Sequence, residues 1–167
     1  MAHHFAASIV LYLFHGATVI LPSSHLAAAI LDAGRDYGGT VLYASPFHHA
    51  LLAAEGSRRP WPELRLAVST AAALPLLTAG AFLRRFGIAL SQAYGIIEVG
   101  LPTVNIAAPD RKPGSVGRPV DGFQVQVRAP SGKRCAPGET GEIFVRGPGM
   151  LDAYLIPQLA RDEILQD

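Results

Sequence analysis

The chain has 167 residues, of which 50% are hydrophobic and 16% are charged, and its formal net charge is +1 at pH 7. This length suffices for one domain or large subdomain with its own core, and the composition is more apolar than that of an average soluble domain. No Lys/Arg cluster is interleaved with aromatic residues, which argues against a nucleic-acid-binding protein. The single cysteine, Cys135, excludes an internal disulfide and favours a cytoplasmic protein.

An apolar run near the N-terminus, residues 5–22, could be taken for a signal peptide or a membrane helix. No Lys or Arg precedes it, so the charged front end of a signal peptide is missing. His15 and Gly16 interrupt the run before it reaches the roughly 20 residues that cross a bilayer. We therefore expect no membrane span, but a helix over 5–14 and a strand over 17–21.

Up to about residue 105, short β-branched or apolar runs alternate with longer helical segments. The runs predict strands at 17–21, 39–44, 64–69 and 88–93. The segments between them predict helices at 23–34, 46–56 and 75–87. Ser23 or Ser24 can cap the first of these helices, and Gly34, Gly56 and Gly87 stand where the helices should end. Apolar strands separated by helices predict an α/β fold with a parallel sheet flanked by helices.

The pattern changes near Pro102, where Gly and Pro turns and short alternating strands begin. Segments 123–129 and 141–147 read as two strands that pair across a turn-rich connection. The predicted organisation has three parts, which are an α/β subdomain over 1–105, a small antiparallel β unit over 106–157, and the start of a helix over 158–167.

Candidate binding residues follow three of the predicted strands. The segments concerned are 44–46, 69–75 and 92–98. Ligands of open parallel sheets bind beyond the carboxyl ends of the strands. Small residues at 70–73 would let a flat ring approach the backbone, and Tyr94 offers a face for stacking. Glu98 could hold a hard cation such as Mg²⁺. From these residues alone the alternative stays open that Tyr94 is a core residue and Glu98 a solvated loop residue.

Other kinds of site find little support in the sequence. Two adjacent side chains on a helix point about 100° apart. Neither the pair His3-His4 nor the pair His48-His49 therefore easily chelates one zinc ion. No G-x-S-x-G nucleophile elbow occurs, which disfavours a serine hydrolase. Neither of the two common phosphate-cradling loops, G-x-x-x-x-G-K-[ST] and G-x-G-x-x-G, is present.

Six segments in chain order carry a family resemblance. They are "MAHHFAASIVLYLFHGATVILP" (1–22), "GGTVLYASPFHHALL" (38–52), "LRLAVSTAAALP" (64–75), "FGIALSQAYGIIEVG" (86–100), "KPGSVGRPV" (112–120) and "PGETGEIFVRGPGMLDAYL" (137–155). Together they resemble the adenylate-forming superfamily, which includes acyl-CoA synthetases, aryl-CoA ligases, luciferases and peptide-synthetase adenylation domains. The resemblance covers nearly the whole chain and implies an internal fragment of the large N-terminal domain of such an enzyme.

The resemblance implies a reaction and a set of residue roles. A carboxylic acid reacts with ATP to give an acyl-adenylate, and the thiol of CoA or of a carrier protein's phosphopantetheine then takes the acyl group. Glu98 would bind Mg²⁺, and His3 would be the catalytic residue at the gate between the acyl pocket and the thiol tunnel. The residues placed around the adenine of ATP or AMP are Ala71, Ala72, Ala73, Gln92, Ala93, Tyr94, Gly95 and Ile97. The residues placed in the acid pocket are Phe5, Tyr43, Ser45, Phe47 and Ile96.

The sequence also departs from the family pattern. Ile97 stands where the family has Thr, so a hydroxyl that meets the phosphate is missing. Ala6 stands where peptide synthetases place an Asp, which disfavours an α-amino acid and favours an aliphatic or aryl acid. The family's Gly/Ser/Thr-rich phosphate loop and its catalytic lysine do not occur in the 167 residues, so we expect the isolated chain to be inactive.

Two other interpretations stay open. The chain could be a stand-alone acyl- or nucleotide-binding or assembly module derived from such an enzyme, or an unrelated α/β protein, which six segments in order disfavour. Its partners would be a carboxylic acid, ATP and the missing domains of the enzyme. Its high apolar content also fits a homodimer that forms through exposed apolar surface.

Overall fold

The computed structural model of the chain describes residues 9–57 and 59–164 and contains a five-stranded sheet and two two-stranded sheets. The large sheet has the order β1-β2-β3-β4-β5, made of Val41–Ala44, Leu66–Ser69, Leu90–Ile96, Gly100–Val104 and Arg118–Pro119. The small sheets pair β6 (Gln124–Arg128) with β7 (Glu142–Arg146), and β8 (Ala153–Tyr154) with β9 (Leu159–Ala160). The α-helices are α2 (Leu11–Phe14), α3 (Ala27–Asp36), α4 (Pro46–Ala54), α5 (Leu76–Phe86) and α6 (Arg161–Ile164).

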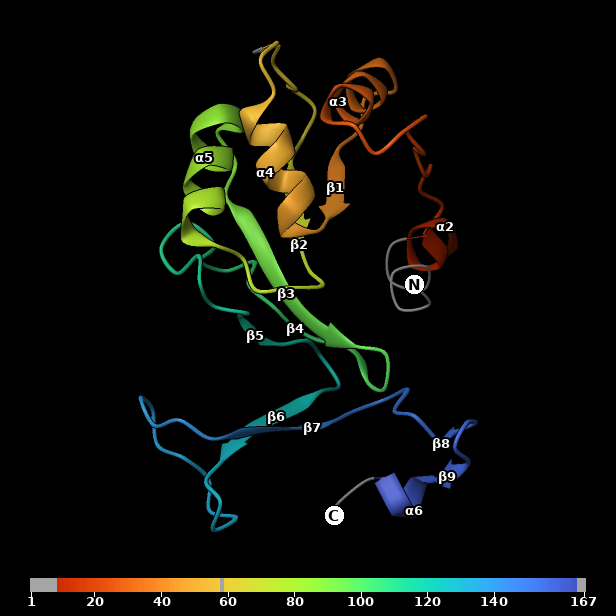
Figure 1. Cartoon of the computed structure of the whole chain (residues 1–167), viewed down its shortest axis with the longest axis vertical. Helices are drawn as coiled ribbons and strands as arrows, with labels where there is room; N and C mark the ends of the chain where they lie inside the picture. The colour runs from red at the N-terminus through yellow and green to blue at the C-terminus, as the bar shows by residue number, and fades with distance from the viewer. Residues whose placement is uncertain (1–8, 58, 165–167) are drawn as a thin grey trace.

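The first three strands of the large sheet are parallel, as the sequence predicts. Ala44 lies opposite Ser69, and Ser69 lies opposite Gln92, so the carboxyl ends of β1 and β2 meet at one edge of the sheet beside Gln92, while β3 continues to Ile96. The sheet then continues with β4 and β5, which pair antiparallel. Figure 1 shows β3 and β4 as a long hairpin that extends beyond this edge toward the C-terminal part of the chain. The hairpin was not predicted, and it carries the candidate metal ligand at its turn.

The hydrophobic core lies where α3, α4 and α5 pack on one face of the parallel strands. Figure 1 shows α4 and α5 side by side over β2 and β3. The buried cluster consists of Leu31, Leu52, Trp61, Leu64, Ala67, Leu74, Ala79, Phe82 and Leu90. Burying a side chain the size of Leu31 or Phe82 stabilises the fold by about 1.5–3 kcal/mol. This packing fixes the strand ends on which the candidate site depends.

Gly34 has a different role from the one that the sequence indicates. The prediction that a helix ends there is wrong, because α3 continues to Asp36 and Gly34 is buried within it. A Cβ at Gly34 would lie 2.0 Å from an atom of the Trp61 ring. The indole nitrogen of Trp61 donates a hydrogen bond of 2.8 Å to the carbonyl of Gly39. Gly34 therefore allows the indole to lie directly against the helix backbone.

Two further helix predictions are confirmed at the ends of α4 and α5. Pro46 occupies the first turn of α4, where its missing N–H is not needed. Gly87 ends α5 with a φ of 71°, a left-handed conformation that glycine adopts without a steric penalty. The predicted cap on α3 is wrong, since Leu26 is its N-cap residue and no side chain caps the helix. The Ser24 hydroxyl instead accepts a hydrogen bond from the Leu26 amide in the preceding turn.

The predicted strand over 17–21 is also wrong. These residues have an irregular backbone and do not pair with β1, and Leu21 is 75% exposed. A β-branched run becomes a strand only where a partner strand can receive its hydrogen bonds, and β1 forms the edge of the sheet. Of the predicted helix over 5–14, α2 is observed at Leu11–Phe14, and the part before residue 9 lies outside the described residues.

The predicted pairing of the two alternating segments is confirmed by β6 and β7. Val125 faces Val145 and Val127 faces Ile143, so these four side chains share one face of the ribbon, and Phe144 lies on the other. Although the predicted subdomain boundary lies near residue 105, the short strand β5 at Arg118–Pro119 still belongs to the large sheet. The start of a helix in the last residues corresponds to α6.

Large apolar side chains remain exposed at several places on the described surface. The most exposed are Phe14 (84%), Leu77 (88%), Leu155 (86%) and Ile156 (89%). Phe14 belongs to α2 and Leu77 to α5, while Leu155 and Ile156 are adjacent in the turn after β8. Self-association through such surface stays a prediction. Over residues 9–57 and 59–164, every helix is too short or too polar to cross a bilayer.

Candidate functional site

The candidate site begins with the loop that leaves β2. Thr70 is buried, and its amide donates a hydrogen bond of 3.2 Å to the carbonyl of Ala44 at the end of β1. Leu74 is buried at the other end of the loop, and its amide donates a bond of 2.5 Å to the side-chain oxygen of Gln92 on β3. Both ends of the loop are thus tied to neighbouring strands, which holds residues 71–73 over the carboxyl edge of the sheet.

The three alanines between these anchors are exposed. Ala71 has a φ of 75°, which is uncommon for a residue other than glycine. Such a conformation is retained only where the surroundings hold it, as the two anchors do here. The result is a strip of methyl groups and backbone that a flat ring can approach closely. This is the feature expected of Ala71, Ala72 and Ala73, and their contact with adenine stays a prediction.

The neighbouring strand β3 divides its predicted site residues into two groups. Gln92 and Ala93 are only 3% and 4% exposed, so their side chains are enclosed, and that of Gln92 serves the loop instead. Tyr94 and Gly95 are half-buried, and Ile97 in the following turn is 58% exposed. The register shifts between Tyr94 and Ile96, where β3 leaves its regular pairing with β4. Accessible surface for a ligand therefore starts at Tyr94.

Glu98 lies in the turn between β3 and β4 and makes two specific bonds. Its Oε1 accepts a hydrogen bond of 2.7 Å from the hydroxyl of Tyr154, and its carbonyl accepts one of 2.7 Å from the amide of Leu151. The pKa of the Tyr154 phenol is raised, mainly by its hydrogen bond to Glu98 and to a smaller extent by burial. Glu98 is therefore not a freely solvated loop residue, although its carboxylate remains partly accessible.

The donor set at Glu98 fits magnesium in a limited way. A carboxylate is the oxygen ligand that Mg²⁺ prefers, and this ion is often held by one or two carboxylates together with water and substrate phosphates. The described residues contain no cluster of three or more His, Cys, Asp or Glu side chains that could enclose a metal. Glu98 could thus supply one ligand to an ion brought in by a phosphate group, but not a closed metal site.

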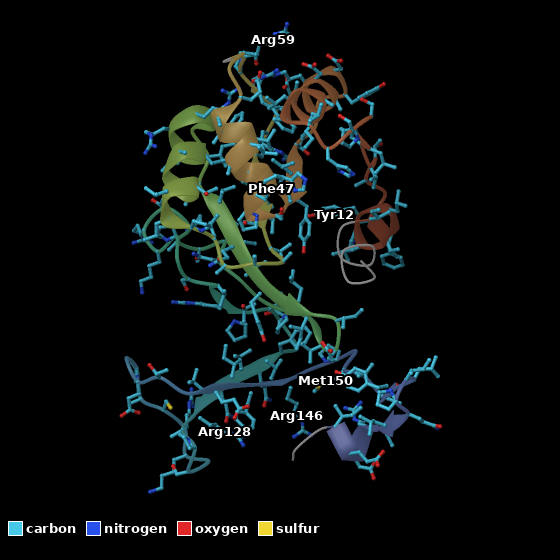
Figure 2. All side chains as sticks on the ribbon, in the orientation of Figure 1. Tyr12, Phe47, Arg59, Arg128, Arg146 and Met150 are labelled. Atoms are coloured by element: carbon cyan, nitrogen blue, oxygen red, sulfur yellow. The ribbon has the colours of Figure 1, made fainter. Side chains whose placement is uncertain are left out.

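Three of the predicted acid-pocket residues, Tyr43, Ser45 and Phe47, lie at the end of β1 and the start of α4. Ile96 lies apart from them at the end of β3 and is 39% exposed. Burial raises the pKa of the Tyr43 phenol, while its hydrogen bond with Thr70 opposes this shift. The Ser45 hydroxyl lies 2.9 Å from Nδ1 of His48. Phe47 is 66% exposed, and Figure 2 shows it on α4. His3 and Phe5 lie outside the described residues, so their roles stay predictions.

Sequence reasoning missed three residues that support the site. Tyr154 and Leu151 hold Glu98 from more than 50 positions away along the chain, which no local pattern reveals. Asn105 is buried, and its backbone amide donates a bond of 2.9 Å to the carbonyl of Gln92. Because a backbone amide makes this bond, the residue type gives no signal for it. Tyr154 lies in a segment quoted for the family resemblance, but that segment indicated no contact with Glu98.

Comparison with known proteins decides the family. The profile of the family described as "AMP-binding enzyme" matches residues 1–155 of this chain. The chain belongs to the AMP-binding enzyme family. Among curated members of this family, it is 33% identical over 159 residues to a feruloyl-CoA synthase of an Amycolatopsis species, which covers 93% of this chain and 32% of that protein. It is 34% identical over 134 residues to a p-hydroxybenzoic acid–AMP ligase of Mycobacterium tuberculosis, covering 80% of this chain and 19% of that protein.

Solved structures of AMP-binding enzymes share the fold. An anthranilate CoA ligase in complex with anthranoyl-AMP matches with a TM-score of 0.81 and 25% identity, over 91% of this chain and 30% of that one. ATP-bound MatB from Rhodopseudomonas palustris matches with a TM-score of 0.82 and 28% identity, over 92% of this chain and 31% of that one. The chain therefore spans at most about a third of the length of these relatives.

Proposed function

We propose that the chain provides the nucleotide-facing wall of an AMP-forming ligase that activates a carboxylic acid and passes it to a thiol. The observation that carries this proposal is that the loop at 71–73, at the carboxyl edge of β2, is anchored to β3. Beyond that anchor, β3 continues to the half-buried Tyr94 and to Glu98 in the β3–β4 turn. Such an edge of parallel strands is where α/β proteins bind their ligands.

In the proposed reaction, a carboxylate oxygen of the acid attacks the α-phosphorus of ATP, and the bond to pyrophosphate breaks. The thiol sulfur then attacks the acyl carbon, and AMP leaves. The loop at 71–73 and Tyr94 would hold the adenine between them, which fixes the position of the α-phosphorus. Mg²⁺, when bound, would neutralise charge on the phosphates, and Glu98 would hold it there. His3 would lie at the gate between the acyl pocket and the thiol tunnel.

The acid would enter from the side of Tyr43, Ser45, Phe47 and Ile96. Relatives named for ferulate, p-hydroxybenzoate and anthranilate support an aryl acid, and the thiol acceptor would be CoA or a carrier protein. We place the enzyme in the cytoplasm because its single cysteine fits a reducing compartment. Ile97 supplies no hydroxyl to the phosphates, so other donors of the enzyme would have to do so.

The 167 residues contain neither a phosphate-cradling loop nor a lysine at a strand end of the described sheet, and we expect that alone they do not complete the adenylation. Removing even one stabilising donor from an active site commonly lowers the rate by orders of magnitude. Nucleotide binding requires fewer of the active-site residues than catalysis does, and a stand-alone binding module would still bind the nucleotide. A test of the proposal should therefore measure binding.

Replacing Tyr94 with alanine is expected to weaken ATP binding by about 5- to 150-fold, because stacking of a base on an aromatic ring contributes about 1–3 kcal/mol. Isothermal titration calorimetry of the chain with Mg²⁺ and ATP measures this change. Tyr37→Ala is the matched control, since Tyr37 is 76% exposed and follows α3. Equal affinity of wild type and Tyr94→Ala, or equal losses in both variants, would contradict the stacking role.

A further inference from the structure

Glu98 is held at two points by a segment far along the chain. The Leu151 amide binds the Glu98 carbonyl, and the Tyr154 hydroxyl binds the Glu98 carboxylate, each at 2.7 Å. In Figure 1 the turn between β3 and β4 lies next to the connection that runs from β7 to β8. One bond fixes the backbone of the turn, and the other fixes the direction of the carboxylate. The two bonds thus act on different parts of the same residue.

The segment that carries Tyr154 is itself braced. Tyr154 pairs with Leu159 in the short β8–β9 ribbon. The guanidinium of Arg161 reaches back to this segment, with Nη1 3.0 Å from the Asp152 carboxylate and 3.4 Å from the Leu151 carbonyl. Figure 2 shows Met150, at the start of the braced segment, close to the tip of the β3–β4 hairpin. The contacts that hold the Tyr154 segment therefore come from β9 and Arg161 and not from β3.

We propose that Tyr154 is a positioning residue that orients the carboxylate of Glu98 toward the metal ion, an inference that rests on the proposed metal role of Glu98. The terminal torsion of a glutamate is broad, so an unsupported carboxylate turns readily. The Tyr154 hydroxyl takes one lone pair of Oε1 and leaves Oε2 to a cation. Carboxylates that bind metals are commonly held by such outer partners, whose loss costs about 10- to 100-fold in metal affinity or activity.

A purely structural tie is the competing explanation, in which Tyr154 only fastens β8 to the hairpin. The Leu151–Glu98 backbone bond separates the two explanations, because it fastens the same segments without touching the carboxylate. Tyr154→Phe removes the hydroxyl and keeps the ring and the backbone bond. A structural tie would show in the exchange rate of the Leu151 amide, whereas a positioning role shows in metal affinity.

The test uses Mn²⁺ as a paramagnetic probe that binds the same oxygen ligands as Mg²⁺. Titration of the ¹⁵N-labelled chain with Mn²⁺ in the presence of saturating ATP, whose phosphates bring the ion to Glu98, should broaden the amide signals of residues 97–99. Tyr154→Phe is expected to need about 10-fold more Mn²⁺ for half-broadening, in line with the loss of an outer partner of a metal-binding carboxylate. Tyr37→Phe, an exposed tyrosine outside this network, is the control and should titrate like the wild type. Exchange of the Leu151 amide should stay unchanged in all variants.

Glu98→Gln distinguishes failure of the inference from failure of the proposed function. If Glu98→Gln abolishes the broadening and Tyr154→Phe weakens it, both ideas are supported. If Glu98→Gln abolishes it and Tyr154→Phe titrates like the wild type, the positioning role is wrong and the metal role stands. If Mn²⁺ broadens these signals equally in Glu98→Gln, or not at all in the wild type, the metal role is wrong and the inference falls with it.

Discussion

Gly117→Ala is expected to lower the free energy of unfolding by about 2–5 kcal/mol, the sum of a left-handed conformation and an overpacked contact. Gly117 has a φ of +83°, and a Cβ there would lie 2.1 Å from the carbonyl oxygen of Val104 on β4. Because the obstacle is backbone, no side-chain rotation relieves it. Urea denaturation of the two proteins, followed by circular dichroism, measures the difference.

Gly132→Ala separates the two causes. Gly132 has a φ of +78°, but its Cβ would meet nothing within 4 Å, so only the conformational cost of about 1–2 kcal/mol applies. The excess loss in Gly117→Ala then measures the close approach to β4. That approach matters to the site because Asn105, next in the chain to β4, binds the carbonyl of Gln92. Equal losses in the two variants would show that the close approach is not present in solution.

The chain is expected to lose about 3 kcal/mol of stability as the pH falls from 6.5 to 4 because of His49 alone, at about 1.4 kcal/mol per pKa unit. Burial lowers the pKa of His49 from 6.5 to about 4. The ring is fully enclosed, with Nε2 3.1 Å from the Val68 carbonyl and the ring of Phe82 against it at 5.1 Å. It stays neutral in the folded state, while the unfolded chain takes up a proton below pH 6.5. The contribution of His49 to stability therefore rises with pH through this window and is constant above it.

His49→Gln tests this assignment, because an amide can still donate to the Val68 carbonyl but does not titrate. Urea denaturation at pH values from 4.5 to 7.5 should show a reduced pH dependence in His49→Gln compared with the wild type. His15→Gln, which changes an exposed ring on the chain segment after α2, should keep the wild-type dependence. An unchanged slope in His49→Gln would mean that other groups cause the loss of stability in acid.

The parallel part of the fold could be predicted because its signals are local. Pro46, Gly87 and the apolar runs at β1, β2 and β3 each indicate an element that the structure contains. Gly34 was misread because the reason for a glycine there is the ring of Trp61, which lies 27 positions further along. Local patterns cannot distinguish a glycine that ends a helix from one that admits a distant side chain.

The candidate site likewise combines residues with local sequence signals and features that depend on distant contacts. The roles of the small residues at 71–73, Tyr94 and Glu98 are predictions from the sequence, and the structure ties the loop at 71–73 to β3, which leads on to the turn that contains Glu98. The buried state of Gln92 and the bond from Tyr154 to Glu98 depend on tertiary contacts, which the sequence does not display. The β3–β4 hairpin escaped prediction because Gly100 and Pro102 resemble the turn-rich sequence that follows, although Pro102 lies within β4.

The most direct test of the account is a map of AMP binding on the chain by ¹H–¹⁵N NMR. The account predicts that AMP shifts the amide signals of residues 71–73 and 94–98, and that the signals of β6 and β7 stay in place. The affected residues come from two segments, the loop after β2 and the end of β3 with its turn, which are far apart in the sequence. Binding of AMP that shifts other residues and leaves these two segments unchanged would contradict the proposal that this edge is the nucleotide wall of an AMP-forming ligase.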